Sequence, residues 1–206
     1  MTKEIGRKGK ESRKRLLDAA TAVFAERGFH DAKVSDIVKR AGLTQPSFYL
    51  YFPSKEAIFA EIVDHFRSRL RELTQEARLE AGIEAKVVSE RIYLAVEAVF
   101  RFLAEDPALT RVGFFLATES SQIKAELAAM IQENLQGEQQ AGYFRSELEM
   151  QTVAECLIGI MERLTVSCLL PGLQAPNGMA QQVVDLLLHG MLTNGHPAEK
   201  KNLHKE

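Results

Sequence analysis

The segment Thr44–Phe52, TQPSFYLYF, holds the residues of this chain best suited to contacting another molecule. At about 100° per residue, a helix beginning near Gln45 turns Phe48 and Phe52 to one side and leaves an outer strip on the other. This outer strip consists of Gln45, Pro46, Tyr49 and Leu50. A surface helix usually carries charged residues there. The strip offers an amide that can pair with adenine, apolar groups that fit a thymine methyl, and a phenol that can reach a phosphate.

The surrounding residues predict a helix-turn-helix that would position this strip. A first helix is expected over Ser35–Arg40, followed by a turn at Ala41–Leu43. Thr44 is the expected N-cap of the second helix, and Pro46 lies in its first turn. Two short helices joined by a glycine-containing turn place the second helix in the DNA major groove. An ordinary helical hairpin with an unusual surface is the alternative.

Two segments, Arg15–Phe29 and Val34–Lys55, together resemble the N-terminal DNA-binding domain of the tetracycline-repressor (TetR) family of bacterial transcription regulators. The shared features are the apolar spacing of the first segment, glycine before an aromatic residue, and the V-x-D-I, AGL and F-Y-x-Y-F motifs. The resemblance covers about fifty positions. It implies an N-terminal helix-turn-helix domain and a C-terminal domain that binds a small effector and forms a dimer.

The resemblance also implies roles for individual residues. Gln45 and Pro46 would contact bases, while Tyr49 and Lys55 would hold phosphates. Lys33 stands where the family commonly has a capping threonine, so the cap is expected from Asp31 or water. Leu50 replaces a commoner histidine or aromatic residue. The complete set of expected DNA-binding residues is Lys33, Ser35, Thr44, Gln45, Pro46, Ser47, Tyr49, Leu50 and Lys55.

Charge is distributed unevenly along the chain. The 206 residues have a net charge of -2, with 46% hydrophobic and 26% charged residues. Residues 1–55 carry twelve Lys or Arg and six acidic residues, so this part has a net charge of +6 and the remainder has -8. Such asymmetry is typical of a nucleic-acid module joined to a domain that does not contact DNA.

Apolar spacing predicts an all-α fold. The first dozen residues are expected to form a polar tail, either solubilising or contacting DNA, before a helix from about Ser12 to an αL cap at Gly28. A connector helix is predicted from Lys55 to about Leu79. Further helices are expected over 84–105, 108–118, 121–137, 149–170 and 179–193. These patterns divide the chain into a three-helix DNA-binding domain, 1–55, and a larger helical effector-binding and dimerisation domain, 56–206.

No pattern in the chain indicates catalysis, a cofactor or a metal. The five histidines lack the H-E-x-x-H spacing of metal ligands, and no phosphate-binding or nucleophile motif is present. Cys156 and Cys168 are expected to be buried reduced thiols, with a redox switch as the alternative. No apolar run is long enough to span a membrane, and no signal core precedes the charged N-terminus. We therefore expect a cytoplasmic protein that is not an enzyme.

Two sets of apolar residues in the C-terminal half are candidates for binding. A ligand cavity between helices is expected to involve Phe100, Phe102, Phe114, Phe115, Met130 and Met161. A dimer interface is expected to involve Met161, Leu164, Thr165, Cys168, Val184, Leu187, Leu188 and Met191. Ordinary burial within one chain is the alternative for both sets.

Together these patterns predict a homodimeric, sequence-specific transcription regulator. We expect it to act as a repressor that a small apolar effector releases from a palindromic operator of double-stranded DNA. A constitutive DNA-binding protein without an effector is one alternative. An all-helical small-molecule carrier or enzyme is the other.

Overall fold

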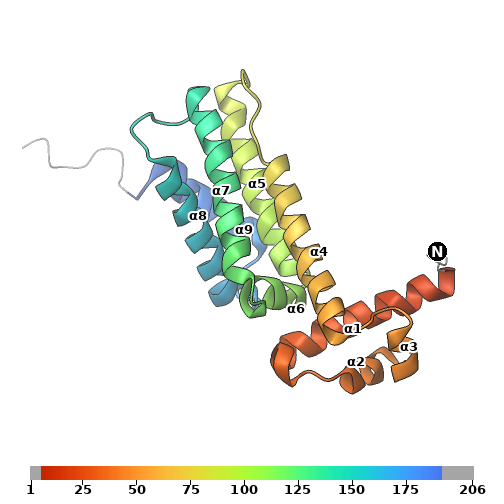
Figure 1. Cartoon of the computed structure of the whole chain (residues 1–206). Coiled ribbons are helices and arrows are strands. Elements are labelled where there is room, and N and C mark those ends of the chain that lie inside the picture. The colour runs from red at the N-terminus through yellow and green to blue at the C-terminus, as the bar shows by residue number, and fades with distance from the viewer. Residues whose placement is uncertain (1–5, 192–206) are drawn as a thin grey trace, which may run out of the picture.

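The computed structural model describes residues 6–191, and all the regular structure in this range is helical (Figure 1). Three helices form the N-terminal unit: α1 (Arg7–Asp31), α2 (Val34–Ala41) and α3 (Gln45–Tyr49). The remaining elements are α4 (Lys55–Glu76), α5 (Ala85–Glu105), α6 (Pro107–Thr110), the π-helix η1 (Arg111–Leu116), α7 (Ser120–Gln140), α8 (Met150–Leu164), the π-helix η2 (Thr165–Leu169) and α9 (Pro176–His189). The expected all-α fold class is confirmed.

The N-terminal unit packs α2 and α3 against the apolar side of α1. Leu16, Ala20 and Phe24 are fully buried at helical spacing along α1. Gly42 ends α2 with a φ of 64°, a left-handed conformation that glycine adopts without a Cβ clash. Thr44 then caps α3 by accepting a hydrogen bond from Ser47 N at 3.4 Å. The predicted helix-turn-helix is therefore present.

Helix α4 joins this unit to the C-terminal bundle (Figure 1). Ser54 caps its start by accepting a hydrogen bond from Ala57 N at 3.2 Å. The helix has 22 residues and is about 33 Å long at 1.5 Å per residue. Ile58 is buried near the N-terminal unit and Phe66 and Leu70 within the bundle. One continuous hydrophobic core consequently runs from the N-terminal unit into the bundle.

In the bundle, the far half of α4 packs against α5 and α7, while α9 packs on α5 and α8 packs on α7 (Figure 1). Ion pairs supplement the apolar contacts across α7. Arg67 of α4 donates from Nε to a Glu126 oxygen of α7 at 2.8 Å, and Lys124 of α7 lies 2.6 Å from Glu162 of α8. Hydrogen bonding to Arg67 lowers the pKa of Glu126, so this carboxylate stays ionised against α4.

Several helix boundaries differ from those predicted. Helix α1 begins at Arg7 rather than near Ser12, because the residues before Ser12 include good helix formers such as Lys and Glu. Gly28 has the expected positive φ, 76°, but it kinks α1, and the helical assignment continues to Asp31. The helices predicted over 108–118 and 149–170 each end in a π-helical turn instead.

The π-helix η1 fits tightly against α4. An added Cβ on Gly113 would lie 2.3 Å from Cδ1 of Phe66, so only glycine lets η1 approach α4 this closely. The residues around Gly113 in the sequence do not indicate this requirement, because it depends on tertiary packing. Between residues 6 and 191, no helix combines the length and apolar character that crossing a membrane requires. The domain boundary at residue 55 remains a prediction.

Candidate nucleic-acid interface and ligand cavity

Helix α3 presents the outer strip to solvent as the sequence indicates. Tyr49 is 57% exposed and Leu50 is 80% exposed, and Gln45 and Pro46 are also exposed. On the opposite side, Phe48 is fully buried. The burial pattern thus separates an inner aromatic face, which fixes the helix, from an exposed outer face, where the Tyr49 ring packs edge-on against Phe48 with centroids 5.3 Å apart.

Helix α1 holds the turn before α3 in place. The Arg15 guanidinium donates hydrogen bonds to the carbonyl oxygens of Ala41 and Gly42. An added Cβ on Gly42 would lie 2.7 Å from the Arg15 guanidinium. Thr44 Oγ1 also lies 2.9 Å from Ser47 Oγ. The chain entering α3 is therefore positioned by fixed hydrogen bonds, which is the preorganisation that base recognition needs.

Lys55 binds the protein's own backbone. Its ammonium donates to the carbonyl oxygens of Phe29 at 2.7 Å, Ala32 at 2.9 Å and His30 at 3.4 Å. It also lies 4.4 Å from the centroid of the Phe29 ring. Since an ammonium has three N–H donors, these carbonyls occupy them all. The geometry supports a role for Lys55 in joining α4 to the end of α1 and does not support the phosphate contact predicted for it.

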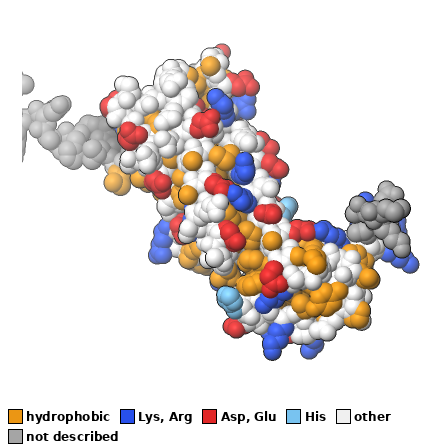
Figure 2. All heavy atoms as spheres, viewed as in Figure 1, with side chains coloured by type: hydrophobic (Ala, Val, Ile, Leu, Met, Phe, Trp, Pro, Cys, Tyr) orange, Lys and Arg blue, Asp and Glu red, His pale blue; other side chains and the backbone are white. Residues whose placement is uncertain are grey.

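Other basic residues are available for phosphates. Among the described residues, those with neither an ion-pair partner nor a side-chain hydrogen bond include Arg7, Lys8 and Lys10 of α1 together with Lys33 and Lys39. Figure 2 shows Lys and Arg side chains along the lower edge of this end of the molecule, beside exposed hydrophobic side chains.

Two expectations concern the start of α2. Lys33 is its N-cap residue and supplies no side-chain cap, and no other described side chain caps the helix in its place, Asp31 included. Ser35 is exposed in the first turn. Both residues are thus accessible, and their contact with phosphate remains a prediction. Lys39 was not predicted; its position in the last turn of α2 is the only sequence signal for it.

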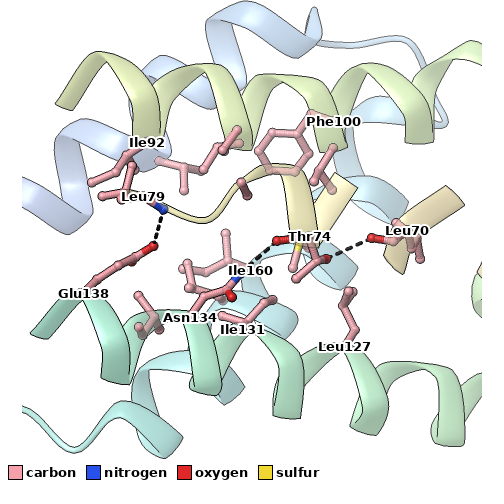
Figure 3. A pocket seen from close by; sticks show the side chains of 18 of the residues that line it. Leu70, Thr74, Leu79, Ile92, Phe100, Leu127, Ile131, Asn134, Glu138 and Ile160 are labelled. Atoms are coloured by element: carbon pink, nitrogen blue, oxygen red, sulfur yellow. Dashed lines mark hydrogen bonds between the residues drawn. The ribbon is translucent and has the colours of Figure 1, made fainter. Parts of the chain in front are cut away.

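A cavity of about 150 Å³ lies within the bundle, between α4, α5, α7, α8 and α9 (Figure 3). Most of its lining is apolar, including Leu70, Ile92, Phe100, Leu127, Ile131 and Ile160. Of the predicted pocket residues, Phe100 and Met161 line this cavity. A cavity of similar size lined by Leu, Ile and Phe is able to hold benzene. The bundle therefore contains room for a small apolar group.

The other predicted pocket residues lie elsewhere. Phe102 and Phe114 stack around Phe66, with ring centroids 5.5 and 6.0 Å from it, so they fill the core. Phe115 packs against Phe114 with centroids 5.3 Å apart, and Met130 is half-buried on α7 outside the cavity lining. An aromatic cluster near the predicted break at Pro107 is consequently packing, not pocket.

Three polar side chains line the cavity, and the sequence did not single them out. Thr74 donates to Leu70 O at 2.9 Å, and Asn134 Nδ2 donates to Thr74 O at 2.8 Å. Glu138 accepts a hydrogen bond from Leu79 N at 2.9 Å (Figure 3). Burial raises the pKa of Glu138, while the Leu79 N–H and the charge of Arg78 oppose that rise. These contacts tie α7 to the last turn of α4 and to the residues that follow it.

The expected dimer residues divide between the surface and the interior. Leu187 is 41% exposed and Met191 is 87% exposed. Leu164, Cys168 and Leu188 are half-buried. In contrast, Thr165 and Val184 are buried within the chain, and Met161 lines the cavity. Exposed Leu186 adds to the outer face, where α8 and α9 enclose a shallow hollow lined by Cys156, Gly159, Ile160, Arg163, Leu164, Gln174, Met179, Gln182, Val183 and Leu186.

The cysteines and the potential metal ligands show no arrangement for chemistry. Cys156 is exposed and Cys168 is half-buried, so the expectation of two buried thiols is wrong for Cys156. It lies on the outer face of α8, which the helical pattern did not distinguish from the inner one. Within the described range, no three His, Cys, Asp or Glu side chains gather as metal ligands would.

Comparison with known sequences identifies relatives along most of the chain. Residues 16–62 match the family model described as bacterial regulatory proteins, tetR family. An HTH-type transcriptional regulator of Bacillus subtilis, YdgC, is 59% identical over 92% of this chain and 97% of its own length. The fatty acid metabolism regulator protein of the same organism is 34% identical over 59% of each chain.

Solved structures show the same fold. The fatty acid degradation regulator FadR of Bacillus halodurans aligns with a TM-score of 0.67 at 24% identity, over 87% of this chain and 96% of its own. FadR of Bacillus subtilis, solved in complex with stearoyl-CoA, aligns with a TM-score of 0.64 at 25% identity, over 87% and 99%. The arrangement of a helix-turn-helix unit joined by one long helix to a bundle is common to them.

Proposed function

Because this chain belongs to the TetR family of bacterial transcription regulators, we propose that it is a homodimeric repressor that a small molecule releases from a palindromic operator. The proposal rests mainly on the outer strip of α3, which is exposed to solvent because the aromatic face on the opposite side is buried. The strip is uncharged, and such groups read base edges better than they bind phosphates. The protein would act in the cytoplasm.

Binding to both halves of an operator requires two copies of the chain. One short recognition helix covers a few base pairs, and a two-fold dimer reads two half-sites about 34 Å apart. The exposed apolar side chains Leu186 and Leu187 of α9, together with the half-buried Leu164 of α8, support dimerisation through this face. Gln45, Pro46, Ser47, Tyr49 and Leu50 would read bases, whereas the Tyr49 hydroxyl, Lys33, Lys39 and the basic start of α1 would hold phosphates.

The cavity supports a small-molecule effector. It touches the last turns of α4, whose first turn holds Lys55 against the end of α1. A ligand that prefers a bundle with α4 displaced would shift the population toward dimers with wrongly spaced recognition helices, and its differential affinity limits that shift. The stearoyl-CoA in the B. subtilis FadR structure supports a partly apolar ligand in this fold.

Selection of bound sequences from a random duplex library, at about 150 mM salt, tests the DNA-binding part of the proposal. At this salt concentration non-specific binding is weakened. We expect enrichment of a two-fold palindrome. Tyr49→Ala should then weaken binding to it by roughly 10-fold or more, since one good contact contributes about 1–3 kcal/mol.

Two further variants separate binding from folding. Tyr49→Phe keeps the ring and removes only the hydroxyl, so it isolates the phosphate contact. Leu94→Ala, which alters a side chain 48% exposed on α5, is the matched control and should bind like wild type. No enriched sequence, or equal affinity of wild type and Tyr49→Ala, would contradict the proposal and favour an architectural or non-DNA role.

A further inference from the structure

We propose that the cavity of the bundle selects molecules that join a small apolar group to a hydrogen-bond donor, an alcohol or an amine, and that Asn134 and Glu138 of α7 receive the donor. The inference rests on the proposed effector site and specifies its ligand. It also separates this chain from a regulator whose ligand has an anionic head group, as a coenzyme A thioester does.

The cavity lining offers acceptors and no cation. Its side chains are apolar except for Thr74, Asn134 and Glu138, and no Lys, Arg or His is among them. Asn134 and Glu138 are four residues apart, so they lie on the same face of α7. Figure 3 shows both side chains reaching from α7 across the cavity toward α4 and the residues after it. A polar head group inside the cavity would therefore meet this pair.

The existing hydrogen bonds determine which atoms remain for a ligand. Thr74 O is an acceptor, so the Asn134 atom that faces it at 2.8 Å must be the amide nitrogen. Its Oδ1 accepts no hydrogen bond from any described residue. One Glu138 oxygen accepts from Leu79 N, and the other likewise has no donor within the described range. Two acceptor oxygens and the second N–H of Asn134 are thus left for a ligand, so a hydroxyl or ammonium group finds more partners here than a carboxylate does.

Charge favours the same class of ligand. The Glu138 side chain belongs to a residue that is only 6% exposed, and it forms no ion pair with a described residue. Arg78 acts on it through charge alone, from an exposed position. A buried carboxylate repels a second anion in a medium of low polarity, whereas a bound donor or ammonium compensates its lost hydration. A carboxylate ligand would also leave both acceptor oxygens unmatched.

Benzyl derivatives fit the cavity volume and vary only the head group. Benzylamine, benzyl alcohol and benzoate would be titrated into the full-length protein near neutral pH, with binding followed by amide chemical shifts. We expect the amine and the alcohol to bind at least 10-fold more tightly than benzoate. The Leu79 amide should shift most, while the Ile83 amide, held 2.9 Å from the Tyr143 hydroxyl, is the internal reference.

A pair of variants tests the role of Glu138. Glu138→Gln removes the charge and keeps an acceptor for Leu79 N, so it should weaken benzylamine binding about 10-fold and change benzyl alcohol binding little. Glu133→Gln, an exposed position on the same helix, should bind all ligands like wild type. Equal loss of amine binding in both variants, or none in Glu138→Gln, would overturn the inference.

Binding of stearoyl-CoA, measured alongside the benzyl derivatives, shows whether the proposed selectivity or the whole effector site is wrong. If benzoate or stearoyl-CoA binds more tightly than the donors, the site stands and its proposed selectivity is wrong. If no probe binds while the protein still selects an operator, the inference fails and the effector part of the proposed function fails with it, but the DNA-binding part stands.

Discussion

Gly113→Ala should destabilise the junction between η1 and α4. The new Cβ would lie 2.3 Å from Cδ1, 2.4 Å from Cγ and 2.8 Å from Cβ of Phe66, whereas ordinary contacts are 3.4–4 Å. Rotating the ring cannot relieve the contact with its own Cβ. Because Phe66 is fully buried between Phe102 and Phe114, α4 and η1 must separate by roughly 1 Å, a shift of the size that overpacking forces on a backbone.

Overpacking of this kind costs about 1–3 kcal/mol, which corresponds to a fall in Tm of roughly 2–12 °C for a chain of this size. Thermal unfolding followed by circular dichroism measures it. Gly137→Ala is the matched control, because its Cβ would meet only Arg78, at 3.8 Å, within a helix. That variant should be slightly more stable than wild type, since alanine favours a helix over glycine by about 1 kcal/mol.

A double variant with a smaller side chain at position 66 tests the clash separately from the change in backbone freedom. With Phe66→Ala already present, Cγ and Cδ1 of Phe66 are gone and only its Cβ, at 2.8 Å, remains near the new Cβ, so Gly113→Ala should cost less than it does in wild type. A Tm for Gly113→Ala within about 1 °C of wild type would refute the reasoning. So would strictly additive effects of the two substitutions, because residues in contact are expected to couple.

Three further outcomes follow from single side chains. Lys55→Met should lower the free energy of unfolding by about 1–2 kcal/mol in urea titrations, since carbonyls at the end of α1 lose a charged donor; weaker operator binding at unchanged stability would instead restore its predicted phosphate contact. Burial raises the pKa of Glu138 above its ordinary 4.5, so the folded chain binds a proton more readily than the unfolded one and loses stability as pH rises through the raised pKa. In urea titrations, Glu138→Gln should therefore have a higher free energy of unfolding than wild type at neutral pH, and the difference should shrink toward pH 4.5. A difference that does not change with pH would contradict this. Leu187→Asp should yield monomers in sedimentation experiments, whereas Leu94→Asp, at a similarly exposed position, should not; dimers in both would move the interface away from α9.

Local features of the fold could be predicted from the sequence. The caps at Thr44 and Ser54 and the turn at Gly42 depend on neighbours within a few residues, so propensity and spacing identify them. The inward direction of Phe48 follows from helical periodicity in the same way.

Features that depend on tertiary packing could not be predicted. Glu138 accepts its hydrogen bond from Leu79, 59 residues away in the sequence, and Lys55 donates to carbonyls up to 26 residues away. Periodicity places an apolar residue on a face, but it does not say whether that face closes on a core or leaves a cavity. Phe114 and Met161 illustrate the difference, because one fills the core and the other lines the cavity.

The contacts at the two ends of α4 are consistent with the proposed control of DNA binding by a ligand in the cavity. At one end, the Lys55 ammonium in its first turn binds carbonyls at the close of α1. At the other, Asn134 and Glu138 bind Thr74 O and Leu79 N. Residues 55–76 form one uninterrupted helix that includes both Lys55 and Thr74, so no loop lies between these two attachments, whereas Leu79 follows the end of the helix. Under the proposed function, a head group that binds Asn134 would therefore act next to Thr74 of a continuous helix whose first residue is fixed to the end of α1.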